Sequence, residues 1–267
     1  MNDLFRGLAP ISPEAWREID AEAKRTLTLT LAARKIVDFT GPLGWQTSSI
    51  DVGRTNDVQA PEDGVEARVR AVQPLVELRV PFQLSRTELE AIGRGARDAD
   101  LDPVRDAARK AATAEDRAVF HGYAQGGIQG MVEAAAGTEL TISDNYVDYP
   151  ALVAEALNNL RSAGIGGPYA VALGPRCYTG LTKTTHGGYP VIEHVRRLLD
   201  GPIVWAPAVN GALVVSVRGG DFELVVGQDF SIGYLDHTAT AVRLYLQDSF
   251  TFRVLASEAA IPLVYQH

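Results

Sequence analysis

Five histidines are the residues of this chain that could bind a metal or transfer protons. They are too scattered in the sequence to predict a metal site. They are His121, His186, His194, His237 and His267. We expect most of them to be surface or capping residues. His186 is set apart because it lies in a loop flanked by glycines.

Acidic pairs and a single cysteine complete the candidates for chemistry. Asp98 and Asp100, and also Glu115 and Asp116, are close in sequence. No desolvated partner for acid–base catalysis accompanies them, so we predict that they are solvated surface groups. Cys177 is the one cysteine, which excludes an intrachain disulfide and predicts a small buried thiol in a reducing compartment.

Catalytic and cofactor motifs are absent from the sequence. It contains no G-x-S-x-G, no G-x-x-x-x-G-K-[ST], no H-E-x-x-H and no C-x-x-C. The run from Gly93 to Asp98 begins like a dinucleotide fingerprint but lacks the last glycine. We therefore predict a protein that is not an enzyme and that needs no cofactor.

The first predicted helix carries a stripe that suggests binding rather than catalysis. Ser12, Pro13 and Glu14 mark its start, and the pattern extends it to about Val37. One narrow stripe at 3.6 residues per turn contains Trp16, Ala23, Leu27, Leu31, Arg34 and Asp38.

Two parts of this stripe predict different roles. Trp16 and Ala23 are expected to pack in the core. Arg34 and Asp38 are harder to bury, because an unpaired buried charge costs several kcal/mol. Leu27 and Leu31, edged by these two charges, predict a groove that docks a peptide.

Residues 46–84 follow the period of a β-strand and predict a long two-stranded arm. Runs that start near Ala67 and Val76 alternate apolar and polar residues, and Ala60–Gly64 is a polar turn. A lone hairpin is only marginally stable in water, so the arm needs a partner surface.

The run Gly219–Tyr234 is dense in turn residues. Gly219, Gly220 and Asp221 predict a tight hairpin turn, because glycine accepts positive φ. Alternation predicts one strand over 222–226 and another over 230–234. So much turn chemistry without catalytic residues indicates a surface built for recognition.

The remaining pattern mixes helices and strands without a βαβ rhythm, which predicts an α+β fold. Helices are expected over 102–126, over 148–163 and from Pro175. Strands are expected over 169–173, 203–205 and 242–252, and 184–190 is a loop.

Composition limits the partners. The 267 residues carry a net charge of −8, which disfavours a nucleic-acid coat. Apolar runs are too short for a membrane span, and the N-terminus does not resemble a secretory signal. We therefore expect a cytoplasmic protein with no nucleic-acid or membrane partner.

Several segments, in their order and spacing, resemble encapsulin shell proteins, the linocin- or bacteriocin-like family of nanocompartments. They are Leu8–Pro10, Trp16–Asp20, Ala33–Asp38, Gly41–Trp45, Pro74–Arg79, Gly167–Tyr169 and Ala241–Leu244, together with the run that begins at Gly219. The resemblance implies the tailed-phage major capsid fold. Its implied parts are a peripheral domain (1–45, 85–143 and 206–267), the extended arm (46–84) and an axial domain (144–205).

The resemblance also implies two sites. The groove of the first helix faces the lumen, binds the C-terminal targeting peptide of a cargo enzyme, and is completed by Ile232 and Tyr234 of the strand over 230–234. The second site is a five-fold pore lined by Thr184, Thr185, His186, Gly187, Gly188 and Tyr189.

The function implied is a self-assembling icosahedral shell of about sixty copies. Its usual cargo in the family is a dye-decolorising haem peroxidase, or a ferritin-like iron oxidase linked to iron storage and oxidative stress. The alternative is a phage or prophage capsid protein, which the acidic charge disfavours. A soluble hydrolase is a third possibility, but the chain lacks the catalytic residues that a hydrolase needs.

Overall fold

The computed structural model describes residues 4–265, and Met1–Asp3 and the predicted surface residue His267 lie outside that range. The helices are α1 (Pro13–Thr30), α2 (Arg86–Gly93), α3 (Asp102–His121), α4 (Met131–Ala134), α5 (Tyr149–Ser162), α6 (Pro175–Lys183) and α7 (Val191–Arg196). The strands up to Pro190 are β1 (Asp38–Thr40), β2 (Ser49–Val58), β3 (Ala67–Pro74), β4 (Val76–Ser85), β5 (Leu140–Ile142), β6 (Tyr169–Leu173), β7 (Thr185–His186) and β8 (Tyr189–Pro190). The later strands are β9 (Ile203–Trp205), β10 (Ala212–Ser216), β11 (Phe222–Val226), β12 (Ser231–His237), β13 (Ala241–Val254) and β14 (Ala260–Tyr265).

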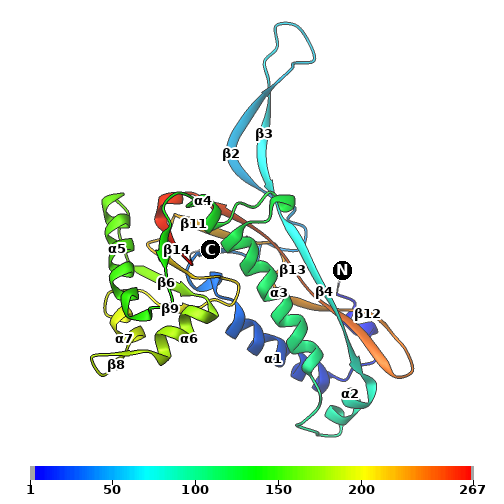
Figure 1. The fold of residues 1–267 in the computed structure, drawn as a ribbon. Coiled ribbons are helices and arrows are strands. Elements are labelled where there is room, and N and C mark those ends of the chain that lie inside the picture. Colours follow the sequence, from blue (N-terminus) through cyan, green and yellow to red (C-terminus); the bar gives the residue numbers. More distant parts are fainter. Residues whose placement is uncertain (1–3, 266–267) are drawn as a thin grey trace.

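The first sheet is organised around the long strand β13. Strands β11 and β12 pair with the two halves of one β13 edge, β4 pairs along the other, and β1 adds in parallel to β11. Helices α1, α2 and α3 pack against β4, β12 and β13 through a shared apolar cluster. Figure 1 shows α3 running diagonally alongside β4.

The second sheet has the order β5-β14-β10-β6-β9 and packs with α5, α6 and α7 in a separate lobe (Figure 1). Its strand β6 is fully buried, as the apolar run Tyr169–Leu173 predicts. A second apolar cluster contains this lobe and also Phe222, Phe250 and Phe252 of the first sheet. The two sheets therefore share one continuous core, and the α+β prediction is confirmed.

The arm is shorter than predicted. Strands β2 and β3 form a two-stranded ribbon that projects from the body (Figure 1). Strand β4 is not part of it, because Val76–Ser85 pairs over its whole length with β13. The alternation of Val76, Leu78, Val80 and Phe82 reflects packing of the sheet on its helices, and the partner strand lies about 170 residues away in sequence.

The first helix also ends earlier than predicted, at Thr30 instead of near Val37. Leu31 has an extended conformation, with ψ 108°. The Asp116 carboxylate accepts the backbone N–H groups of Ala32 (2.9 Å) and Ala33 (3.0 Å). These two donors are thus bonded outside the helix, and the chain turns into a short 3₁₀ segment at Ala33–Lys35.

The Gly219–Asp221 turn is not a hairpin, although Gly219 and Gly220 have the positive φ values expected (88° and 82°). Strand β10 before the turn belongs to the second sheet, and β11 after it belongs to the first. The turn therefore carries the chain between sheets. The predicted strands over 222–226 and 230–234 are confirmed as β11 and the start of β12.

Other boundaries follow local chemistry. The strands 169–173 and 203–205 agree with the prediction. Helix α3 ends at His121 instead of near residue 126, because Gly122 adopts φ 88°.

The predicted domain boundary between residues 205 and 206 divides the second sheet, since β10 and β14 pair with β6 and β5. Short elements such as α2, α4 and β5 had no clear sequence signal.

Candidate functional site: a groove between α1 and β12

An apolar groove of about 600 Å³ lies between the C-terminal half of α1 and the start of β12. We call it the α1–β12 groove. Its buried lining consists of Ala23, Leu27, Leu31, Ile232 and Leu246. These side chains belong to the apolar cluster between the helices and the first sheet, so the groove is an opening in the core at the molecular surface.

Polar side chains form the rim of the groove. Arg6, Asp20, Lys24, Thr28, Lys35 and Asp229 lie around it. Arg6 binds Asp20 at 2.6 Å and stacks over the Trp16 ring at 3.9 Å. The backbone carbonyl of Leu4 accepts the Tyr234 N–H at 2.9 Å. The segment before α1 therefore closes one end of the groove against β12.

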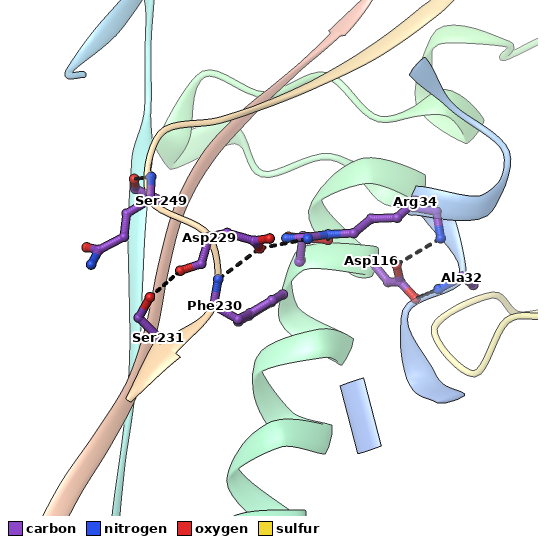
Figure 2. Close-up of polar contacts among 10 residues, drawn as sticks. Ala32, Arg34, Asp116, Asp229, Phe230, Ser231 and Ser249 are labelled. Atoms are coloured by element: carbon purple, nitrogen blue, oxygen red, sulfur yellow. Dashed lines mark hydrogen bonds and ion pairs between the residues drawn. The ribbon is translucent and has the colours of Figure 1, made fainter. Parts of the chain in front are cut away.

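Arg34 joins three parts of the chain at the other end (Figure 2). Its guanidinium donates to both oxygens of Glu115 on α3 (2.8 and 2.6 Å) and to Asp229 in the loop before β12 (2.7 Å). The Phe39 and Phe230 rings lie 5.1 and 4.8 Å from it. Although burial opposes the charge, the hydrogen bonds to Glu115 raise the pKa of Arg34, which keeps it cationic.

Two buried acids lie behind Arg34. Burial raises the pKa of Asp116 to about 7, against the opposing effect of the two N–H groups it accepts. Asp248 on β13 is 1% exposed, and no N–H or hydroxyl group among residues 4–265 donates a hydrogen bond to its carboxyl oxygens. Burial, and then the charge of Glu115, raise the pKa of Asp248 well above its usual range. The buried surroundings of Arg34 thus favour the protonated form of the Asp116 and Asp248 carboxyl groups.

Four of the six predicted groove residues meet in this groove: Leu27, Leu31, Arg34 and Ile232. Asp38 does not. It begins β1 beside β11, and its carboxylate accepts the Gly220 N–H at 2.6 Å. It lines a separate cavity of about 170 Å³. The helical stripe that linked Asp38 to Leu31 does not exist, because α1 ends at Thr30, before both residues.

Tyr234 also lies outside the groove lining. Its hydroxyl contacts the Nδ1 atom of His237, and its backbone N–H donates to the Leu4 carbonyl of the N-terminal segment. The prediction that Glu115 and Asp116 are surface acids was wrong, because both are 0% exposed. Asp98 and Asp100 are exposed as predicted, and Cys177 is buried as predicted.

Sequence reasoning missed several groove residues. Lys24 and Thr28 stand three residues before Leu27 and Leu31 respectively, so the same helical spacing could have found them. Asp229 had no such signal. It reaches Arg34 only because β12 folds beside α1, 195 residues away in sequence.

The predicted pore residues form a small hairpin at the tip of the second lobe. Strand β7 (Thr185–His186) pairs with β8 (Tyr189–Pro190), and Gly187 and Gly188 connect them with φ of 59° and 84°. Two positive φ values make this a type I′ turn, which needs glycine-like residues. The His186 and His194 rings lie 6.0 Å apart, and residues 185–189 of the hairpin are exposed.

Residues 4–265 contain no cluster of three or more potential metal ligands. None of the helices in this range is long and apolar enough to span a membrane. The groove offers apolar contact with a charged rim, which suits peptide binding better than bond-making chemistry.

Comparison with known proteins decides the family. The model of the Linocin_M18 family, described as encapsulating protein for peroxidase, matches residues 1–251. This chain belongs to the encapsulin shell-protein family. A type 1 encapsulin shell protein of Rhodospirillum rubrum is 59% identical over 270 residues, which cover 98% of this chain and 96% of that protein.

Solved structures show that the encapsulin fold is that of phage capsid proteins. A virus-like particle from Pyrococcus furiosus aligns with a TM-score of 0.63 at 18% identity, over 92% of this chain and 98% of its own. A structure of Mycobacterium phage Bobi aligns with a TM-score of 0.58 at 15% identity, over 89% and 91%. The predicted tailed-phage capsid fold is therefore confirmed.

Proposed function

We propose that this chain assembles into a closed icosahedral shell of about sixty copies in the cytoplasm, and that the α1–β12 groove holds the C-terminal peptide of an enclosed enzyme. The protein itself performs no reaction. Its contribution is confinement, docking and selection of what passes the pore.

The lining of the α1–β12 groove supports the proposed docking of a peptide. The groove combines Leu27, Leu31 and Ile232 on its floor with paired charges on its rim. Burying a few aliphatic side chains of a peptide stabilises the complex by about 1.5–3 kcal/mol each, against the cost of ordering a flexible tail. Single-site binding is then weak, and an oligomeric cargo is retained because it engages many identical sites.

The proposed cargo is a dye-decolorising peroxidase, with a ferritin-like protein as the second possibility. The name of the matching family model, encapsulating protein for peroxidase, supports the first. The loop Thr184–Tyr189 is proposed to line the five-fold opening, since it is an exposed hairpin at the tip of its lobe.

The test is purification of particles from cells that also express a reporter fused to the C-terminal tail of a candidate peroxidase. Light scattering and electron microscopy give the particle mass and shape, and gel analysis gives reporter per subunit. We expect closed particles that contain the reporter only when it carries the tail. Soluble monomers would refute the shell, and particles filled with nucleic acid would favour the phage capsid alternative.

A further inference from the structure

Three carboxyl groups are buried at the end of the α1–β12 groove, where one guanidinium group faces them. Glu115 and Asp116 on α3 are 0% exposed, and Asp248 on β13 is 1% exposed. Among residues 4–265, Arg34 is the one cation that forms an ion pair with any of the three, and it also binds Asp229 in the loop before β12. The buried acids therefore outnumber the positive charge that faces them.

Asp248 and Glu115 form a hydrogen bond that needs a proton. Their carboxyl groups bond to each other, although no N–H or hydroxyl group in the described part of the chain donates to Asp248. Both oxygens of Glu115 already accept N–H groups of Arg34, at 2.8 and 2.6 Å. Ionised carboxylates are acceptors only, so this bond exists only when one of the two acids is protonated. Asp248 is the acid without an ion pair to Arg34, so it carries the proton.

The surroundings of Asp248 keep the proton in place. Burial and the charge of Glu115 raise the pKa of Asp248, and Asp229 adds to this effect, whereas Arg34 opposes it. Asp116, the neighbour of Glu115 on α3, binds the backbone N–H groups that follow α1. The neighbouring strand and loop present uncharged residues: Leu78 of β4 lies opposite Asp248, Glu77 and Arg79 beside it pair with each other, and the Gln228 carbonyl accepts the Ser249 N–H.

Ionisation of Asp248 would leave two buried carboxylates facing one guanidinium group, which is strongly unfavourable. The arrangement can relax at its most exposed member. The side chain of Asp229 is 44% exposed, whereas that of Arg34 is 15% exposed. A negative charge on Asp248 repels Asp229 and attracts Arg34. The contact between Arg34 and Asp229, at 2.7 Å, is therefore the one that ionisation weakens.

The contact between Arg34 and Asp229 ties the two walls of the groove together at this end. Figure 2 shows Arg34 reaching from the segment after α1 to Asp229 before β12. The Asp229 carboxylate also accepts the Phe230 N–H at 2.8 Å, and its backbone carbonyl accepts the Ser231 hydroxyl at 2.7 Å. Phe230, Ser231 and Ile232 line the groove. A change in the position of Asp229 therefore reaches the surface that would hold the peptide.

We propose that the proton shared by Asp248 and Glu115 controls docking in the α1–β12 groove. With the proton present, Arg34 holds Asp229 and the groove keeps the shape that a peptide fits. When the proton leaves to a base in solution, Asp229 separates from Arg34 and the groove opens at this end. The peptide binds the protonated form, so its affinity falls as the pH rises. This inference rests on the proposed peptide docking and names its regulation, with Asp248 as a positioning residue.

The rotation of a reporter inside intact shells tests this coupling. The reporter is a monomeric fluorescent protein that carries the C-terminal tail of a candidate peroxidase and whose fluorescence does not change with pH. A docked reporter rotates with the shell, so time-resolved anisotropy gives the ratio of docked to free reporter. We expect this ratio to fall about tenfold from about pH 5 to about pH 9, a typical size for coupling between two sites.

Two variants show which acid is responsible. Asp248→Asn keeps the shape of the side chain and can still donate to Glu115, so it should abolish the pH dependence of docking. Asp98→Asn removes an exposed acid far from the groove lining and should keep the pH dependence of the parent. Burial raises the pKa of Asp116 to about 7, so this acid also titrates in the range tested. A fall in docking that persists in Asp248→Asn would therefore overturn the inference.

Infrared spectroscopy checks the shared proton itself. A protonated carboxyl group has a C=O stretching band that a carboxylate lacks. The difference spectrum between the parent and Asp248→Asn should show this band at low pH, and the band should disappear together with the docked fraction as the pH rises. A missing band, or equal docking of the parent at both pH values, would overturn the inference. A reporter that rotates freely in the parent shells at every pH would instead refute the proposed function.

Discussion

Arg34 and Glu115 form a two-point ion pair at the end of the groove, Nε to Oε1 at 2.8 Å and Nη2 to Oε2 at 2.6 Å. The Glu115 side chain is 0% exposed and that of Arg34 is 15% exposed. The sequence predicts this arginine at the edge of an open groove, where its removal would change the stability of the fold little. In the structure it neutralises a buried carboxylate, so its loss has a larger effect.

Arg34→Ala should therefore destabilise the subunit by about 3–5 kcal/mol, because it leaves Glu115 buried without a counter-charge. Arg34→Lys should cost less, since it keeps the charge but loses the two-point geometry. Urea unfolding followed by tryptophan fluorescence measures both. Arg17→Ala is the control, because the Arg17–Glu14 pair is exposed and screened by solvent, so its loss should change the stability little. Equal effects at positions 17 and 34 would contradict this reading.

Cargo loading should depend on Leu31. Leu31→Asp places a carboxylate in the α1–β12 groove and removes apolar contact worth about 1.5–3 kcal/mol, so we expect at least a tenfold loss of tailed reporter per particle. Leu29→Asp is the matched control, because Leu29 lies on the same helix but is 66% exposed and outside the groove lining.

Leu31 is itself 7% exposed, so Leu31→Asp can also weaken the fold. Thr28→Arg avoids that problem, since Thr28 is exposed on the rim and a larger side chain fills the groove without burying a new charge. Empty but intact shells are expected from Thr28→Arg. Full loading in both variants would show that the cargo binds elsewhere.

Assembly should require the arm. Deletion of Asp57–Arg70 removes the tip of the arm and the outer half of β3. It keeps Gln73, whose side chain anchors the arm base to Thr251 (3.0 Å) and the Phe252 carbonyl (2.7 Å). The body should keep its secondary structure and remain as small oligomers or aggregates. Analytical ultracentrifugation gives the result, and intact closed shells from the deletion would contradict the prediction.

Permeation through the proposed pore should depend on His186. Five His186 side chains would surround the five-fold opening of the proposed shell. His186→Asp should therefore place a ring of negative charge there and slow the entry of small anions, whereas His186→Ala, which adds no charge, should slow it much less. Quenching of a dye inside the particles by added iodide measures anion entry, with His237→Asp as the control. A density map that places the hairpin away from the five-fold axis would exclude the mechanism.

Stability should fall as the pH rises, because of the buried acids. Asp248 has a raised pKa when folded and ionises near 4 when unfolded, so its contribution is complete at low pH and is lost as the pH rises toward its folded pKa. The contribution of Asp116 to stability is lost in the same direction, as the pH rises from about 4 to about 7. Asp248→Asn removes one titrating group of similar shape. Its melting temperature should therefore exceed that of the parent at pH 8 and match it near pH 4, and a lower value at pH 8 would refute the argument.

Local patterns by themselves determined several elements and the family. The Ser12–Pro13 start of α1 and the apolar run of β6 each depend on neighbouring residues only, so the sequence predicts them. The ordered motifs along the chain also identified the encapsulin family, which the family model confirms.

Long-range pairing is what only the tertiary structure decided. Asp116, on a helix more than 80 residues away, accepts the backbone N–H groups that follow α1, so the helix ends there. As a result Asp38 lies outside the groove and bonds to Gly220. Strand β4 looked like part of the arm because its partner β13 is distant in sequence. Glu115 looked like a surface acid because its counter-charge, Arg34, lies 81 residues away. A carboxylate's burial depends on the cation that faces it, and periodicity along one segment carries no information about that partner.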